Sequence, residues 1–217
     1  MGKLIVIEGL DGSGKATQTK LLYDALCKRG ERAMQITFPN YDSPSSAPVK
    51  MYLSGQLGAK PGDVNAYAAS SFYAVDRYAS YKTVWGEFYK SGGTVVSDRY
   101  TTSNAVHQCS KLPRAQWDAF LDWLFIFEYE QIAIPAPDVV IYLDVEPDVS
   151  QQLMTARYHG DEAQKDIHEK DTAYLQSSRS AAQYCAQKLH WRRVACTENG
   201  AMRSIEAIHA EVMALLG

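Results

Sequence analysis

Residues 4–17 have the sequence LIVIEGLDGSGKAT, in which an apolar run leads directly into a glycine-rich segment and a lysine. The apolar run over residues 4–7 predicts a buried strand, and the apolar spacing after residue 15 predicts a helix. Glycine adopts backbone conformations that side chains forbid, so successive N–H groups can turn inward around an anion at the start of that helix. A strand, a glycine-rich loop and a helix in this order are typical of a phosphate-binding site.

The glycine-rich segment fits the P-loop of nucleoside triphosphate-binding proteins with one departure. Lys15 occupies the position of the lysine that reaches the β- and γ-phosphates, but Ala16 replaces the Ser or Thr that normally ligates magnesium. Thr17 cannot substitute, because one residue along a helix rotates a side chain by about 100° and lifts it by about 1.5 Å. We therefore expect Mg²⁺ to be held mainly by ATP oxygens, water and carboxylates. The residues expected to bind ATP are Gly9, Leu10, Asp11, Gly12, Ser13, Gly14, Lys15, Ala16 and Thr17.

The composition suits one α/β domain over residues 1–217, since 46% of the 217 residues are hydrophobic. The formal net charge of −3 argues against a nucleic-acid polymer as partner, because that binding needs clustered Lys and Arg. No run of about 18 apolar residues is present, and the N-terminus enters a strand almost at once. We expect a cytoplasmic protein without a membrane partner, whose four cysteines are reduced thiols.

Strand and helix signals alternate through the rest of the chain. This order predicts a three-layer α/β fold in which helices flank a mostly parallel, five-stranded sheet. After the first helix, the expected strands cover residues 33–38, 94–97, 139–143 and 191–195. Between the first two of these strands we expect a loop over 39–62, with at most a short helix near 49–53, and a long helix from an N-cap at Asp63 to Tyr89.

The later helices are expected on both sides of the third and fourth of these strands. Pro113 opens a helix with an apolar stripe of Trp117, Phe120, Leu121, Leu124 and Phe127, and two helices separated by residues 158–165 follow the strand over 139–143. A closing helix carries Ile205, Ile208, Val212 and Leu215 on one face.

A second group of polar residues follows the strand expected at 94–97. Asp98, Arg99 and Tyr100 lie at a strand end, where the ligands of open α/β sheets gather, and a guanidinium group binds phosphate in a bidentate manner. Tyr73 and Arg77 are four residues apart on the long helix and so share one face, with a ring for a base and a cation for a phosphate. The alternatives are an ion pair that braces the sheet edge and a packed tyrosine beside a solvated arginine.

In combination these motifs resemble the thymidylate kinases, P-loop nucleoside monophosphate kinases that transfer phosphate from ATP to dTMP to give dTDP. The resemblance covers most of the chain, and the combination is far more specific than any single motif. The matching stretches are residues 5–17, Phe38-Pro39-Asn40-Tyr41, residues 73–77, residues 98–100, Ser103-Asn104-Ala105, Gln108 and residues 142–145.

The resemblance implies a role for each matching residue. Lys15 holds the donor, Asp11 organises magnesium and the phosphates, and Arg99 binds the acceptor phosphate. Tyr73 stacks on thymine and Arg77 contacts the base, while Asp98 lies near magnesium. The other residues implied at the acceptor site are Phe38, Pro39, Tyr41, Asn104, His107 and Gln108. The family also implies a homodimer that acts in dTTP biosynthesis.

The chain departs from the family at Ala16, at His107 and in the lid. His107 stands where the family often has a Tyr or Phe against the sugar, which affects discrimination between deoxyribose and ribose. The lid, approximately residues 157–167, must close over the nucleotides to exclude water. Arg157 is its candidate catalytic cation, with His159 and Lys165 nearby, although Arg157 also suits an exposed surface.

Other functions stay open at this point. The chain can be a kinase for another nucleotide or for a deoxynucleoside, which would need a carboxylate to activate a 5′-hydroxyl. A GTPase-type switch is disfavoured because no Asn-Lys-x-Asp sequence for guanine is present. A non-catalytic nucleotide-binding module is the remaining alternative, given Ala16.

Overall fold

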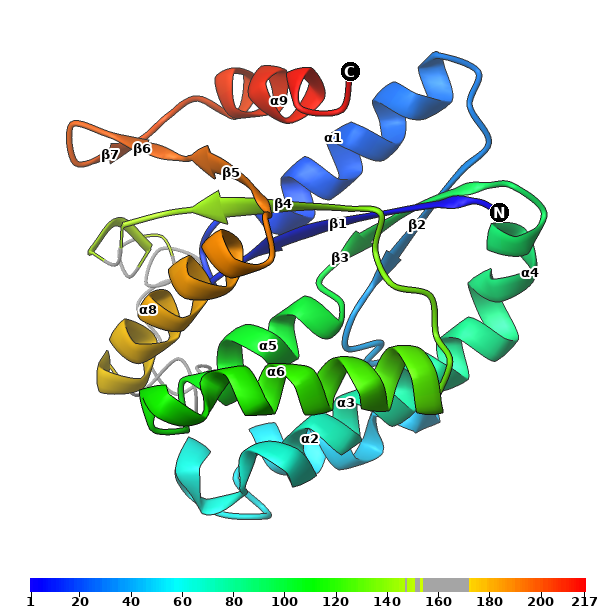
Figure 1. Cartoon of the computed structure of the whole chain (residues 1–217). Helices are drawn as coiled ribbons and strands as arrows, with labels where there is room; N and C mark the ends of the chain where they lie inside the picture. Colours follow the sequence, from blue (N-terminus) through cyan, green and yellow to red (C-terminus); the bar gives the residue numbers. More distant parts are fainter. Residues whose placement is uncertain (147, 151–152, 154–171) are drawn as a thin grey trace.

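The central element is a parallel sheet of five strands in the order β2-β3-β1-β4-β5 (Figure 1). It is seen in a computed structural model that describes residues 1–146, 148–150, 153 and 172–217. The five-stranded parallel sheet predicted from the sequence is confirmed. Its strands are β1 (Lys3–Gly9), β2 (Ala33–Thr37), β3 (Thr94–Asp98), β4 (Val139–Asp144) and β5 (Arg192–Ala195).

Helices cover both faces of the sheet, with α1 and α9 on one side and α3, α5, α6 and α8 on the other (Figure 1). Between β5 and α9 lies a small antiparallel hairpin, β6 (Thr197–Glu198) with β7 (Ala201–Met202). The α-helices are α1 (Lys15–Lys28), α2 (Ala47–Leu53), α3 (Ala66–Ser80), α4 (Gly86–Lys90), α5 (Thr101–Cys109), α6 (Trp117–Phe125), α8 (Thr172–Lys188) and α9 (Ile205–Ala214). The π-helical turns are η3 (Tyr81–Trp85) and η5 (Ile126–Gln131). The 3₁₀ turns are η1 (Pro44–Ser46), η2 (Pro61–Asp63) and η4 (Arg114–Gln116). Within the described ranges, no helix has the length and apolarity needed to cross a bilayer.

Alternation along β1 determines which side chains face each helical layer. Ile5 and Ile7 belong to the apolar cluster formed with α1 and α9, whereas Leu4 and Val6 belong to the cluster formed with α3, α5, α6 and α8. Because side chains alternate along a strand, Glu8 falls on the α5 side at the carboxyl end of β1. The parallel register pairs Ile7 with Asp98, so the P-loop and the residues after β3 leave the sheet at the same edge.

The apolar stripe predicted for α6 is confirmed as core. Trp117, Phe120, Leu121 and Leu124 are buried, and Phe127 is half-buried and stacks on Trp123. A 3₁₀ turn follows Pro113 before α6 begins, and α6 continues into the π-helical turn η5.

The prediction that Asp63 caps the long helix is wrong. Asn65 is the N-cap of α3, and its Oδ1 accepts a hydrogen bond of 2.9 Å from the Ala68 N–H. Asp63 closes the preceding 3₁₀ turn, where its carboxylate accepts from the Lys60 N–H. The reason is Pro61, which opens that turn two residues earlier and leaves Val64 extended.

Two other expectations need correction. The helix expected to run unbroken to Tyr89 leaves α-helical geometry at Tyr81 and resumes at Gly86. Leu215, expected on the closing helix, is the C-cap residue that follows α9, and Ile205, the first residue of α9, is 52% exposed where it borders the cavity described below.

Replacing the N-cap Asn65 by Ala should lower the free energy of unfolding by about 1 kcal/mol, since one N–H of the first turn of α3 loses its acceptor. The Asn65→Asp variant is the control, because its carboxylate keeps the acceptor. Urea unfolding followed by circular dichroism measures both variants. Equal stability of Asn65→Ala and the parent chain would contradict this capping role.

Candidate active site

A cavity of about 1440 Å³ lies at the carboxyl edge of the sheet. It is bordered by the P-loop, the segment after β2, α3, and the start of α5, and by Met202, Arg203 and Ile205 near the hairpin. The predicted donor and acceptor sites therefore share one cavity. The predicted residues that line it are Asp11, Gly12, Ser13, Gly14, Lys15, Ala16, Thr17, Phe38, Pro39, Tyr41, Tyr73, Arg77, Asp98, Arg99, Asn104, His107 and Gln108.

Among the described residues, Gly9 and Leu10 were predicted at the site but do not line this cavity. Leu10 is buried in the core cluster on the α5 side. A Cβ atom at Gly9 would lie 2.5 Å from the Ser13 Oγ and 2.9 Å from the Leu143 carbonyl oxygen, so this position needs glycine. Arg157, His159, Lys165 and the lid of residues 157–167 lie outside the described residues.

The P-loop has the backbone expected of an anion cradle. Gly12 and Gly14 adopt left-handed conformations with φ of 76° and 81°. Gly14 is the N-cap of α1, which has no side-chain cap and no acidic residue in its first turn. The N–H groups at this helix end are thus left for an anion, which the partial positive charge of the helix terminus favours.

Lys15 is buried and bends back over the loop. Its Nζ donates to the Leu10 carbonyl oxygen at 2.8 Å and lies 3.9 Å from the Asp11 carboxylate. Burial, and after it the positive charge of Arg99, lowers the pKa of the Lys15 ammonium group from 10.5 to about 8. An anion bound beside Lys15 would favour the charged form of the ammonium group and raise this pKa again.

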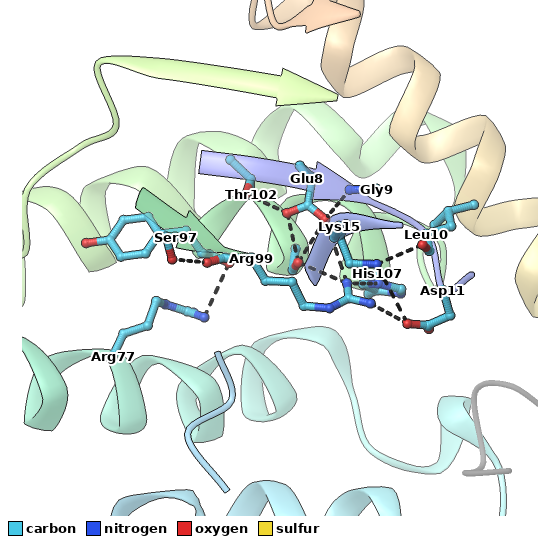
Figure 2. A network of polar contacts seen from close by, with 12 residues as sticks. Glu8, Gly9, Leu10, Asp11, Lys15, Arg77, Ser97, Arg99, Thr102 and His107 are labelled. Carbon is cyan, nitrogen blue, oxygen red and sulfur yellow. Dashed lines mark hydrogen bonds and ion pairs between the residues drawn. The ribbon is translucent and has the colours of Figure 1, made fainter. Parts of the chain in front are cut away.

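Arg99 is the centre of the polar network and has an unusual backbone, with φ of 65°. Figure 2 shows its side chain extending between Glu8 and His107 toward Asp11. Nη2 donates to the Asp11 carboxylate, while Nη1 lies 3.7 Å from the Glu8 carboxylate and 3.3 Å from the His107 Nε2. Nη1 also donates to the Ser103 hydroxyl at 3.2 Å. Burial opposes the charge, but the two carboxylates outweigh it and raise the pKa of the Arg99 guanidinium.

Glu8 is a buried partner of Arg99 that was not predicted from the sequence. It is 1% exposed and accepts hydrogen bonds from the Thr102 hydroxyl at 2.6 Å, the Ser103 hydroxyl at 2.8 Å and the Gly9 N–H at 3.0 Å. It therefore supports Arg99 from the side opposite Asp11 (Figure 2). A carboxylate at the end of an otherwise apolar strand was the available signal.

Arg77 is 1% exposed, which excludes the solvated arginine considered as an alternative. Its Nε and Nη2 donate to the two carboxylate oxygens of Glu128, at 2.7 and 2.5 Å. Glu128 is fully buried and also accepts from Thr101 and Asn104. Glu128 was not predicted from the sequence, because its partners are far away along the chain.

Other predicted residues form the walls of the cavity. Phe38 is buried against Tyr100, with ring centroids 5.9 Å apart, and a cis peptide bond joins it to Pro39. Tyr73 is half-buried, whereas Tyr41 is 51% exposed at the rim. Gln108 is buried, and neither polar atom of its amide has a hydrogen-bond partner in the described part of the chain.

Asp98 and Asp11 are the carboxylates available to a magnesium ion. Asp98 Oδ1 is buried without a hydrogen-bond partner among the described residues. Mg²⁺ in nucleotide sites is usually bound by one or two carboxylates together with phosphate oxygens and water. The two aspartates fit this donor set, although no group of three or more potential metal-ligating residues exists among those described.

Comparisons with known proteins agree on one family. The family model described as "Thymidylate kinase" matches residues 7–212. Thymidylate kinases from Schizosaccharomyces pombe and Homo sapiens are 26% and 28% identical to the chain, each over 99% of it and over 91% and 89% of the relative. The thymidylate kinase of Mycobacterium tuberculosis is 28% identical over 80% of both chains. The solved structure of the Candida albicans enzyme has the same fold, with a TM-score of 0.71 at 19% identity over 99% of this chain and 91% of that one.

The lowered pKa of Lys15 predicts that the free protein binds ATP less tightly as the pH rises. A lysine with a pKa of about 8 loses its charge above pH 8, so affinity for a non-hydrolysable ATP analogue should fall about fivefold between pH 8 and pH 9. Calorimetric titration measures this change. The Lys15→Met variant should bind more weakly at every pH but without the slope, and an equal slope in both proteins would contradict the assignment.

Proposed function

The chain belongs to the thymidylate kinase family, and we propose that its cavity holds ATP and dTMP with their phosphates facing one another across Asp11. The reaction of the family is transfer of the γ-phosphate of ATP to dTMP. One observation carries the site assignment: Asp11 contacts both Lys15 at the P-loop and Arg99 after β3. The cation for the donor and the cation for the acceptor are thus adjacent.

On the donor side, the P-loop N–H groups and Lys15 bind the phosphates of ATP. The triphosphate would replace the Leu10 carbonyl oxygen as the partner of the Lys15 ammonium group. Arg203, Ile205 and Met202 line the cavity beside α1 and are suited to contact the rest of the donor nucleotide.

On the acceptor side, Arg99 binds the phosphate of dTMP. Its guanidinium is already oriented by Glu8 and Ser103, so little side-chain entropy is lost on binding. The nucleoside lies between the wall formed by Phe38 and Pro39 and the α3 face that carries Tyr73 and Arg77. A phosphate-binding arginine at this position favours a monophosphate over a nucleoside as acceptor.

Magnesium would be held by Asp11 and Asp98 with phosphate oxygens and water, because Ala16 provides no hydroxyl. The ion supplies charge compensation for the transferred phosphoryl group. Phosphoryl transfer has a loose transition state, so alignment and positive charge are the main needs, and Lys15 and Arg99 meet both. The lid, approximately residues 157–167, would close over the nucleotides and exclude water, with Arg157 as a further cation.

We also propose that the chain is a single domain that acts as a cytoplasmic homodimer. The outer face of α3 supports the dimer, because Tyr67, Val75 and Tyr78 are 43%, 53% and 42% exposed there. These residues follow helical spacing and form one apolar face. Sedimentation equilibrium of the purified chain tests this state.

Incubation with ATP and Mg²⁺ should give rapid ADP release with dTMP, slower release with dUMP and little release without an acceptor. Both monophosphates fill the Arg99 and Arg77 positions, but dUMP lacks the 5-methyl group of thymine and so buries less apolar surface in the cavity. A coupled assay for ADP over a panel of monophosphates and nucleosides measures this. Equal ADP release without any acceptor would favour an ATPase or a switch.

The Arg99→Ala variant should lose about 100-fold in kcat/KM for dTMP with little change in the KM for ATP, since one charge-stabilising group is removed at the acceptor. The Lys15→Ala variant should lose activity with every acceptor, because donor binding fails. Steady-state kinetics separate the two effects. Arg32→Ala, a change at an exposed arginine that contacts Ser91, is the control and should be unaffected; full activity in Arg99→Ala would overturn the assignment.

A further inference from the structure

We propose that Glu128 determines which bases the acceptor site selects, by fixing the hydrogen-bonding direction of Asn104 and Arg77. The inference rests on the proposed function, since it concerns the base of the acceptor nucleotide. Glu128 lies on the π-helical turn η5 and is 0% exposed. It does not line the cavity, so it acts through its two partners, which do.

The amide of Asn104 has one orientation. Its Nδ2 donates to the Ser70 carbonyl oxygen at 3.2 Å and to the Glu128 carboxylate at 3.1 Å. Both partners are acceptors only, so the amide nitrogen must face them, and the oxygen must face away. Among the described residues no hydrogen bond involves Oδ1, and this atom is left as an acceptor for a group in the cavity.

The guanidinium of Arg77 is fixed in the same way. Nε and Nη2 are held by Glu128, and Nη1 donates to the Tyr100 carbonyl oxygen at 3.4 Å. Of the five N–H groups of an arginine, these three bonds leave two. Arg77 therefore offers donors to the cavity in which Asn104 offers an acceptor.

A donor and an acceptor on one wall complement a base that presents an acceptor and an N–H group. Thymine and uracil have this pattern at O4 and N3, whereas cytosine presents an amino group and an unprotonated N3. Cytosine would thus oppose a donor to Arg77 and an acceptor to Asn104. A site built to pair a base N–H rejects a base that lacks it, because the buried polar atoms stay unpaired.

Glu128 is suited to this role because a carboxylate can only accept. It receives bonds from Arg77, Asn104 and the Thr101 hydroxyl, which lies 2.8 Å away. A glutamine at this position has the same shape but can donate. Its amide nitrogen would allow Asn104 to rotate, so that the Asn104 amide nitrogen faces the cavity.

The test is the Glu128→Gln variant, assayed for kcat/KM with dTMP and with dCMP in the same preparation. The ratio of the two should fall at least about tenfold, the size of one well-formed hydrogen-bonded base contact. An unchanged ratio in a folded, active variant would overturn the inference. A ratio is chosen because general loss of stability lowers both rates together.

Asp144→Asn is the matched control. Asp144 is also a buried carboxylate, 3% exposed, and accepts from the Arg193 Nε at 2.8 Å, but it does not line the cavity. It should lose stability and leave the ratio unchanged. An equal change of the ratio in both variants would show a general loosening and would overturn the inference.

A second measurement covers the case in which an uncompensated Arg77 prevents Glu128→Gln from folding. In the unmodified protein, nuclear magnetic resonance should show Asn104 side-chain amide protons that exchange slowly and lie close to Ser70, with and without dTMP. Amide protons that turn toward dTMP on binding would overturn the inference. If the unmodified chain fails to phosphorylate dTMP, the proposed function falls, and the amide orientation in the free protein still decides the role of Glu128.

Discussion

The arrangement of the site depends on charge compensation of the Arg99 guanidinium at the end of β3, where the side chain is only 16% exposed. A cation removed from water is costly unless carboxylates compensate it. Removing one partner of such a pair is more destabilising than replacing both partners by apolar residues. Glu8 and Asp11 supply this compensation from the end of β1 and from the P-loop. The parallel register that pairs Ile7 with Asp98 brings all three residues to the same edge.

The same network links the two halves of the cavity. Asp11 lies within ion-pair distance of Lys15 and Arg99, so a change at either cation alters the electrostatic environment of the other. The effect is visible in Lys15, whose pKa falls through burial and then through the charge of Arg99. In the proposed complex, phosphate oxygens would replace protein oxygens as partners of these cations, so the cations would stay paired. Association would then gain charge-assisted hydrogen bonds without leaving a charge unpaired.

Local patterns were sufficient for the sheet and the P-loop but not for the groups that support the site. The strands and the glycine positions were predictable because side-chain period and left-handed turns are properties of a few neighbouring residues. Glu8 and Glu128 were missed because their partners are distant: Ser103 is 95 residues from Glu8, and Arg77 is 51 residues from Glu128. The N-cap of α3 was misplaced by two residues, because Pro61 draws Asp63 into a turn of its own.

Two buried acids thus each hold one arginine of the proposed acceptor site, Glu8 with Arg99 and Glu128 with Arg77. A buried ion pair contributes little net stability, and apolar residues of similar volume are often as stable or more so. Stability alone therefore does not explain two such pairs beside one cavity. What an apolar replacement would lose is direction, since a carboxylate fixes where a guanidinium points and leaves defined N–H groups for a ligand. On this argument the acids are retained for the geometry of the arginines, one oriented toward a phosphate and the other toward a base.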